Sequence, residues 1–288
     1  MNQEKIYCIA GHRWKVEGAG WQQALEALGG FRHFLLPADG TAVPDFVFRA
    51  GIMVPSFRQM LYTFQYEDIR CRFGQTAEGV LLELCPADEP RLCCWTEGEA
   101  VFLAGHPSPR LLRFALWMGY GFQTVRKDTV ALHSSCIVYR GKAVLFLGES
   151  GTGKSTHTRL WSTCIEGSEL LNDDSPVVRC GPDGIRVYGS PWSGKTPCYK
   201  CESYPLAGCV RLVQAPSNRM ERLPVVPAFA ALHPSAPPAF AYCTALYDGV
   251  CHTLSALLAA VPVFRLYCRP DEEAARLACR TLFPGDEP

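Results

Sequence analysis

The segment Gly148-Glu149-Ser150-Gly151-Thr152-Gly153-Lys154-Ser155 decides how this chain is interpreted. It fits the pattern Gly-x-x-x-x-Gly-Lys-Ser/Thr, in which glycines let the main chain curl so that successive N–H groups point inward at phosphate oxygens. In this pattern the lysine supplies a mobile positive charge for the phosphates, and the hydroxyl that follows it is a ligand for Mg²⁺. We therefore predict that Gly148–Ser155, together with Thr156, binds the phosphates of ATP.

The residues on both sides of this segment fit the same interpretation. The apolar run Ala143–Leu147 predicts a strand that leads into it, and a helix is expected from Lys154 to about Ile165. The start of that helix would add the positive end of its dipole to the phosphate site. The alternative is a glycine-rich turn without a ligand, and the flanking strand and helix argue against it.

The pair Asp173-Asp174 is the second candidate feature. It follows a short predicted strand that ends at Leu171, and one helix and one strand fit between Lys154 and the pair. The pair should therefore return to the edge of the sheet at which the glycine-rich segment lies. Two carboxylates at a nucleotide phosphate can divide the work, because one holds the metal and the other accepts a proton from an attacking hydroxyl. The alternative is a solvated turn.

Two further side chains are candidates for the same site. His133 lies on a predicted strand, Val130–Tyr139, which pairs with the strand that feeds the glycine-rich segment. It could orient a carboxylate, sense a phosphate or bind a second metal, and the alternative is a histidine of the core. The Gly/Ser-rich turn Gly189–Lys195 would bring Lys195 to a phosphate or carboxylate of the substrate, and the alternative is an exposed turn.

The order of these features resembles the nucleotide site of the HPr kinase / phosphoenolpyruvate carboxykinase superfamily, because an acidic pair so soon after the lysine is its distinguishing mark. Over about residues 110–215 the chain is similar to bacterial HPr-kinase-like proteins, some of which phosphorylate a peptide serine. The resemblance implies a mixed sheet wrapped by helices. It also implies Asp173 as the base with His133 beside it, and Ser155 and Asp174 as Mg²⁺ ligands. We count Lys154 and Lys195 among the catalytic candidates.

The function that this resemblance implies is an ATP- and Mg²⁺-dependent kinase. It would move the γ-phosphoryl group to a hydroxyl, with a serine of a peptide or protein as the first candidate and a small molecule as another. The Glu-Arg-Gly segment of true HPr kinases does not occur in the sequence, so HPr is not the expected substrate. A nucleotide-binding regulatory module without turnover and a carboxykinase-like lyase stay open as alternatives.

The rest of the chain predicts an α/β protein with two domains. Residues 1–108 contain short alternating or apolar runs bounded by Gly and Pro, and they predict a smaller β-rich N-terminal domain. The break Gly105–Pro109 separates it from a nucleotide-binding kinase domain over residues 109–288. Within the second domain, the proline-rich stretch Pro216–Pro238 predicts a structured loop or lid with one short helix.

Composition excludes several classes of protein. The 288 residues carry 28 Lys+Arg and 28 Asp+Glu, and a net charge of zero argues against a protein whose main work is binding nucleic acid. Apolar runs stay below the ~18 residues of a membrane span, and a signal peptide is not recognisable, so a cytoplasmic location is the default expectation. The 15 cysteines predict buried thiols, with a metal or redox role for Cys198/Cys201 as the alternative. The oligomeric state stays open, a homo-oligomer included.

Overall fold

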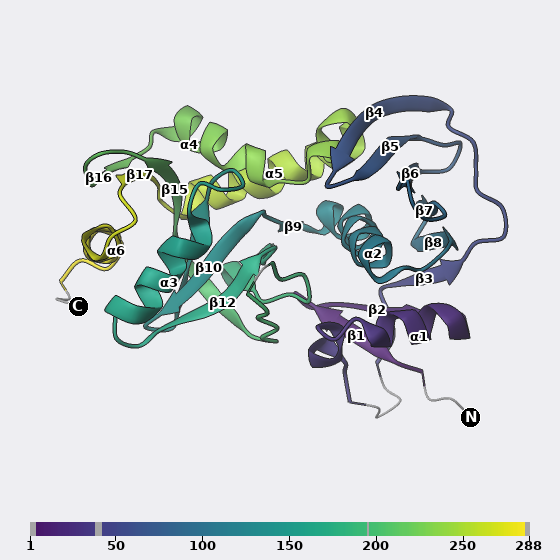
Figure 1. Ribbon diagram of the computed structural model, residues 1–288, viewed down its shortest axis with the longest axis horizontal. Coiled ribbons are helices and arrows are strands. Elements are labelled where there is room, and N and C mark those ends of the chain that lie inside the picture. Colours follow the sequence, from purple (N-terminus) through teal and green to yellow (C-terminus); the bar gives the residue numbers. More distant parts are fainter. Residues whose placement is uncertain (1–3, 38–41, 195, 286–288) are drawn as a thin grey trace. The chain divides into compact units, whose positions relative to one another are not determined.

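The computed structural model describes residues 4–37, 42–194 and 196–285. They form an α/β structure with mixed sheets and helices (Figure 1). Contacts divide the chain into two units. The first comprises residues 1–127 and 238–249, and the second comprises residues 128–237 and 250–288.

An eight-stranded sheet forms the basis of the first unit, in the order β1-β2-β3-β8-β7-β6-β5-β4 among the described residues. The pairs β2–β3 and β3–β8 are parallel, and the other neighbouring pairs are antiparallel. The strands are β1 Ile6–Ile9, β2 His12–Val16, β3 Phe46–Ala50, β4 Gln59–Tyr66, β5 Ile69–Gln75, β6 Val80–Cys85, β7 Leu92–Glu97 and β8 Ala100–Gly105. The helices are α1 Ala19–Ala27, η1 Phe31–Phe34, α2 Pro109–Thr124, η2 Val125–Lys127, η4 Pro238–Tyr242 and the start of α5 Thr244–Ala260.

Helix α2 belongs to the first unit because it packs against β6 and β7 of that sheet (Figure 1). Its Tyr120 is buried and donates a hydrogen bond to the carbonyl oxygen of Ile9 at 3.0 Å. Aromatic rings pack between helix and strands, as where the ring centroids of Tyr120 on α2 and Phe46 on β3 lie 6.2 Å apart. The sequence placed the domain boundary near residue 108, before this helix. The division by contacts lies after the helix, because its apolar face covers the first sheet.

The second unit is built on a mixed sheet, in the order β12-β10-β11-β15-β14-β13-β9 among the described residues, with β17 paired to β15 and β16 paired to β17. The pairs β11–β15 and β15–β17 are parallel, whereas β10 is antiparallel to both β11 and β12. The strands are β9 Thr129–Ala131, β10 Ser134–Tyr139, β11 Lys142–Leu147, β12 Ser168–Asp174, β13 Val177–Gly181, β14 Gly184–Tyr188, β15 Ser203–Gln214, β16 Arg219–Arg222 and β17 Val263–Cys268. The helices are α3 Lys154–Cys164, α4 Val225–Leu232, η3 His233–Ser235, the rest of α5, and α6 Glu272–Leu282.

The helices α3 and α6 lie side by side in the second unit (Figure 1). They share one apolar core with β10, β11, β15 and β17, in which the rings of Phe146 and Trp161 lie 5.6 Å apart. Asp271 caps α6 by accepting a hydrogen bond from the N–H of Ala274 at 3.0 Å, as a residue of its type at this position predicts. This core holds β11 and the start of α3 in place on either side of the glycine-rich segment.

Four features of the second unit differ from the prediction. The strand expected over Val130–Tyr139 is two strands, because Leu132 and His133 donate their N–H groups to Pro176 and Ser235 where the chain passes from one part of the sheet to another. The strand expected to end at Leu171 continues through the acidic pair as β12. Two elements were not expected, namely helix α5 and strand β16, and the strand lies within the stretch Pro216–Pro238 that was predicted as a loop or lid with one short helix.

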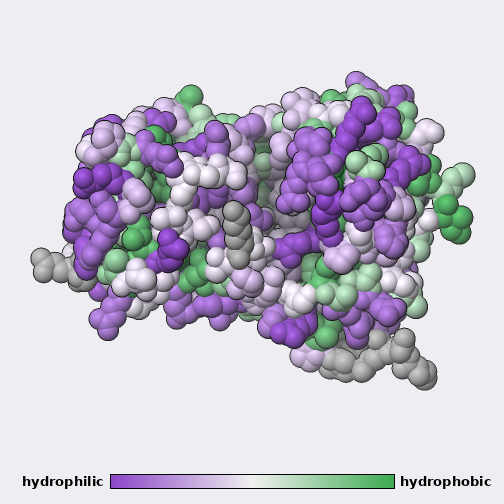
Figure 2. All heavy atoms as spheres, in the orientation of Figure 1, coloured by the Kyte–Doolittle hydropathy of each residue, from purple (hydrophilic) through white to green (hydrophobic). Residues whose placement is uncertain are grey.

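The face shown in Figure 2 is mostly hydrophilic, as expected for a chain whose apolar side chains fill the cores of its units. Among the described residues, no helix combines the length and the apolar character that are needed to cross a membrane.

Candidate functional site

The glycine-rich segment forms the loop between β11 and α3. Gly151 and Gly153 have φ values of 82° and 104°, a backbone region that glycine occupies at little cost. Within the curl, Thr152 donates its N–H to the carbonyl oxygen of Glu149 at 3.2 Å. Gly153 occupies the N-cap position of α3 without a side-chain cap, so the first N–H groups of the helix lack that partner. This arrangement is suited to binding an anion.

Lys154 crosses the base of the loop. Its Nζ donates to the carbonyl oxygens of Gly148 at 2.8 Å and Glu149 at 3.2 Å, and it lies 3.0 Å from Nε2 of His133. The side chain is buried, and burial lowers the pKa of the Lys154 ammonium, although the carboxylates of Asp174 and Asp173 oppose that effect. The positive charge therefore sits at the loop in a poorly solvated position, where a phosphate would stabilise it.

Asp173 is the buried member of the acidic pair, with 4% of its surface exposed. Its Oδ1 accepts a hydrogen bond from the hydroxyl of Ser155 at 3.0 Å, and a second from the hydroxyl of Ser135. Ser135 lies directly opposite Asp173 in the pairing of β10 with β12. The structure thus joins the hydroxyl at the start of α3 to the carboxylate at the end of β12.

Asp174 has different surroundings. Its Oδ1 lies 3.3 Å from Nδ1 of His133, and its Oδ2 accepts a hydrogen bond from the Ser175 hydroxyl at 3.0 Å. Because Nε2 of His133 faces the Lys154 ammonium, we assign the imidazole hydrogen to Nδ1, from which it points at Asp174. The resemblance had implied His133 beside Asp173. The observed partner is Asp174, because neighbouring residues on a strand point to opposite faces.

A second segment is bound to the end of β12. The side chain of Asn172 donates to the backbone oxygens of Ser190 and Trp192 at 3.2 and 3.3 Å, and it accepts from the N–H of Ser175 at 2.9 Å. The N–H of Gly194 donates to the carbonyl oxygen of Asp173 at 2.6 Å. These bonds bring the predicted Gly/Ser-rich turn to the acidic pair as far as residue 194. Lys195 lies outside the described residues.

Ser135, Asn172 and Ser190 were not among the predicted site residues. Asn172 stands next to Asp173 in the sequence, and Ser135 lies two residues after His133. Nothing in the sequence shows that the Ser135 side chain meets Asp173 or that the Asn172 side chain meets the Gly189–Lys195 turn. Arg211 lies in the C-terminal half of β15, opposite Leu147 in the register, and its guanidinium is 3.6 Å from the carboxylate of Glu149.

Two cavities flank the start of α3. One, of about 260 Å³, is lined by Ser155, Asp173 and Thr196 among others. The other, of about 410 Å³, is lined by the loop glycines and by apolar side chains such as Leu160 and Leu212. Thr156 borders both of them. The start of α3 therefore borders two cavities, a smaller one lined mostly by polar residues and a larger one lined partly by apolar residues.

The side chains at the first cavity suit a hard divalent cation. The hydroxyl of Ser155 and the carboxylate of Asp173 are oxygen donors of the kind that Mg²⁺ prefers, and Mg²⁺ in such sites keeps several waters and takes other ligands from phosphates. No group of three or more His, Cys, Asp or Glu side chains within residues 4–37, 42–194 and 196–285 could hold a metal alone. A divalent cation bound beside Ser155 and Asp173 would therefore need further oxygen ligands from water or from a bound anion.

The chain has a distant structural likeness to a known protein. No protein-family model matches the chain, and no curated protein matches it. Among solved structures, the HPr(Ser) kinase/phosphatase from Coxiella burnetii matches with a TM-score of 0.32 and 14% sequence identity, over 53% of this chain and 87% of that one. A likeness this weak does not decide function, which therefore rests on the residues of this chain.

Proposed function

We propose that the chain is an ATP- and Mg²⁺-dependent phosphotransferase that moves the γ-phosphoryl group to a hydroxyl, in the first place a serine of a peptide or protein. The observation that carries the proposal is the hydrogen bond between Ser155 and Asp173, which joins the glycine-rich loop to the acidic pair. A glycine-rich turn without a ligand gives no reason to bury a lysine and a carboxylate at the same loop.

The loop and Lys154 would bind the triphosphate. Uncapped N–H groups of α3 and the curl of Gly148–Gly153 offer donors to phosphate oxygens. The Lys154 ammonium, held now by two carbonyl oxygens, would exchange them for phosphate oxygens, which carry more negative charge. The rest of the nucleotide would occupy the cavity of about 410 Å³, in which Leu160 and Leu212 offer apolar contacts.

The contacts favour a division of work between the carboxylates that differs from the one implied by the resemblance. Ser155 and Asp173 would hold Mg²⁺, which neutralises charge on the phosphate oxygens when it is bound. Asp174 is held by Nδ1–H of His133 and its side chain is 36% exposed, so it can meet an acceptor hydroxyl. Asp174 would take the hydroxyl proton while the hydroxyl oxygen forms its bond to phosphorus, and ADP would leave with the electrons of the broken bond.

The test is phosphoryl transfer from γ-³²P-labelled ATP into an extract of the source cells. The wild-type protein should label an acceptor only with Mg²⁺ present, and Asp174→Asn should abolish labelling while Mg²⁺–ATP binding, followed by calorimetry, persists. Asp183→Asn, in the exposed turn between β13 and β14, is the matched control and should keep full activity. Binding without any transfer would favour the regulatory module, and product formation from oxaloacetate would favour the lyase.

A further inference from the structure

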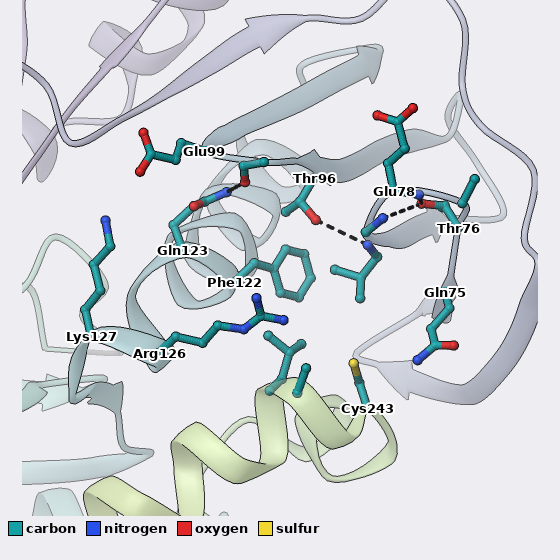
Figure 3. Close-up of a pocket in the computed structure, with 16 residues that line it drawn as sticks. Gln75, Thr76, Glu78, Thr96, Glu99, Phe122, Gln123, Arg126, Lys127 and Cys243 are labelled. Atoms are coloured by element: carbon teal, nitrogen blue, oxygen red, sulfur yellow. Dashed lines mark hydrogen bonds between the residues drawn. The ribbon is translucent and has the colours of Figure 1, made fainter.

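The first unit contains a pocket of about 500 Å³ that the proposed function does not use (Figure 3). Four segments surround it, namely the β5–β6 turn, the β7–β8 turn, the end of α2 with η2, and the start of α5. Ligand pockets in proteins have volumes of roughly 300–1,000 Å³, and this one lies within that range.

The walls of the pocket are fixed by hydrogen bonds between its segments. The hydroxyl of Thr96 accepts from the N–H of Val80 at 3.2 Å, which ties the two turns together. Gln123, on α2, donates to the carbonyl oxygen of Gly98 at 3.0 Å. The two turns also touch closely at Gly79, where a Cβ atom would come within 2.3 Å of the Thr96 carbonyl oxygen. A pocket with such fixed walls loses little conformational entropy when it binds a ligand.

Two cationic residues line the pocket, Arg126 and Lys127, and both are exposed. Figure 3 shows the guanidinium of Arg126 reaching toward the middle of the pocket beside the Phe122 ring, whereas the carboxylates of Glu78 and Glu99 point away from it. The guanidinium of Arg126 makes no hydrogen bond or ion pair with any residue of the described part of the chain. A guanidinium presents a planar fork of donors that matches a carboxylate.

The lining beside Arg126 is apolar. Phe122, Val80, Leu246 and Cys243 are each less than 9% exposed and contribute side chains to the pocket. The space therefore offers one cationic fork next to a hydrophobic surface. The lining carries two acidic residues, Glu78 and Glu99, and two basic ones, Arg126 and Lys127, so its formal charge is zero and it suits a ligand with one negative charge better than one with several.

We propose that this pocket binds a carboxylate that carries an apolar group. The carboxylate would pair with Arg126, and the apolar group would lie against Phe122 and its neighbours. This chemistry is shared by the C-terminal residue of a peptide and by a free N-acylated amino acid. The proposal stands on the first unit alone, so it survives or fails independently of the phosphotransferase.

The experiment is a titration of the full chain, followed by saturation-transfer NMR, with three probes. They are N-acetyl-L-leucine, its carboxamide, and a tetrapeptide that ends in leucine with a free carboxylate. The acid should bind about tenfold or more tightly than the carboxamide, because the carboxamide cannot form the charged pair with Arg126. A tetrapeptide that binds more tightly than the free acid identifies a peptide C-terminus as the ligand, whereas equal binding identifies a small acid.

Variants locate the binding. Arg126→Gln should weaken the binding of the acid about tenfold and leave the affinity for the carboxamide unchanged. Arg70→Gln, an exposed arginine of the same sheet outside the pocket, is the matched control and should bind the acid as the wild type does. Ala245→Trp, at an exposed position of the lining, should block the pocket for all three probes without unfolding the chain, as circular dichroism would show. Three results would each overturn the proposal. They are the absence of NMR saturation transfer from the protein to either acid, equal affinities for the acid and the carboxamide, and an unchanged affinity of Arg126→Gln for the acid.

Discussion

Replacing Asp173 by Asn should change the affinity for ATP in opposite directions with and without Mg²⁺. The Asp173 carboxylate is buried beside Ser155, at the place proposed for the metal. Without metal, this negative charge repels the phosphates. With metal, it attracts the cation that the phosphates share. The asparagine side chain would have nearly the same shape and could still accept a hydrogen bond from Ser155, so the change tests the charge.

The size of the effect follows from the burial. Two unit charges about 5 Å apart interact by roughly 3 kcal/mol at an effective dielectric constant of about 20. Screening by salt and by the partly open cavity reduces this value, so we expect about 1–2 kcal/mol in each direction. Metal-free ATP should then bind Asp173→Asn about 5- to 30-fold more tightly than the wild type, and Mg²⁺–ATP should bind it more weakly by a similar factor.

Isothermal titration calorimetry in EDTA and in excess Mg²⁺ measures both affinities. Asp183→Asn removes a carboxylate from an exposed turn and controls for the change in net charge. Asp173 does not face the metal if Asp173→Asn weakens the binding of metal-free ATP. The same conclusion follows if Mg²⁺ increases the affinity for ATP by the same factor in this variant as in the wild type. The same two titrations on Asp174→Asn should show a smaller change in the advantage conferred by Mg²⁺, because Asp174 is bonded to His133.

Two other substitutions test the same region. Lys154→Met should weaken the binding of ATP about 10- to 100-fold with or without Mg²⁺, because it removes the charged donor. It should leave the free energy of unfolding almost unchanged, since burial of the ammonium is costly. Lys142→Met, at the exposed start of β11, is the matched control, and equal ATP affinities of the two variants would contradict the role of Lys154. Burial lowers the pKa of His157 to about 4, below its ordinary 6.5, and Trp161 donates to the neutral ring at 3.2 Å. The neutral ring stabilises the fold fully above pH 6.5, and roughly 3 kcal/mol should be lost as the pH falls to 4. In urea unfolding between pH 6.5 and 4, the free energy of unfolding should therefore fall more steeply for the wild type than for His157→Asn. The variant His252→Asn, at an exposed histidine, is the control and should behave as the wild type does. Equal slopes of the unfolding free energy against pH for the wild type and His157→Asn would contradict this prediction.

The parts of the fold that could be predicted carry local signals. The strand and helix around the glycine-rich loop, β17 and α6 with its Asp271 cap each follow from periodicity or from one capping residue. Helix α5 carries a signal of the same kind that the prediction missed, because its buried residues Leu246, Val250, Leu254 and Leu257 recur every three or four positions. Assigning α2 to the first unit needs the contact of its apolar face with β6 and β7, which no local pattern contains.

In the candidate site, spacing alone indicated that the acidic pair returns to the loop, and the hydrogen bond from Ser155 to Asp173 shows that it does. The supporting residues could not be predicted, because they come from pairing across strands. Ser135 meets Asp173 only through the register of β10 with β12. Asn172 holds the segment around Ser190 only because that segment folds back over the end of β12.

The continuation of β12 through residues 173 and 174 explains why two adjacent carboxylates have different partners. In a turn, both side chains could approach the same group, and their like charges would raise the pKa of one of them. In a strand, they point to opposite faces, so Asp173 meets the Ser155 hydroxyl while Asp174 meets His133. His133 then contacts both Asp174 and Lys154, and it connects the carboxylate on one face to the ammonium at the loop. A substitution at His133 would therefore alter both groups at once, whereas one at Ser135 would alter Asp173 alone.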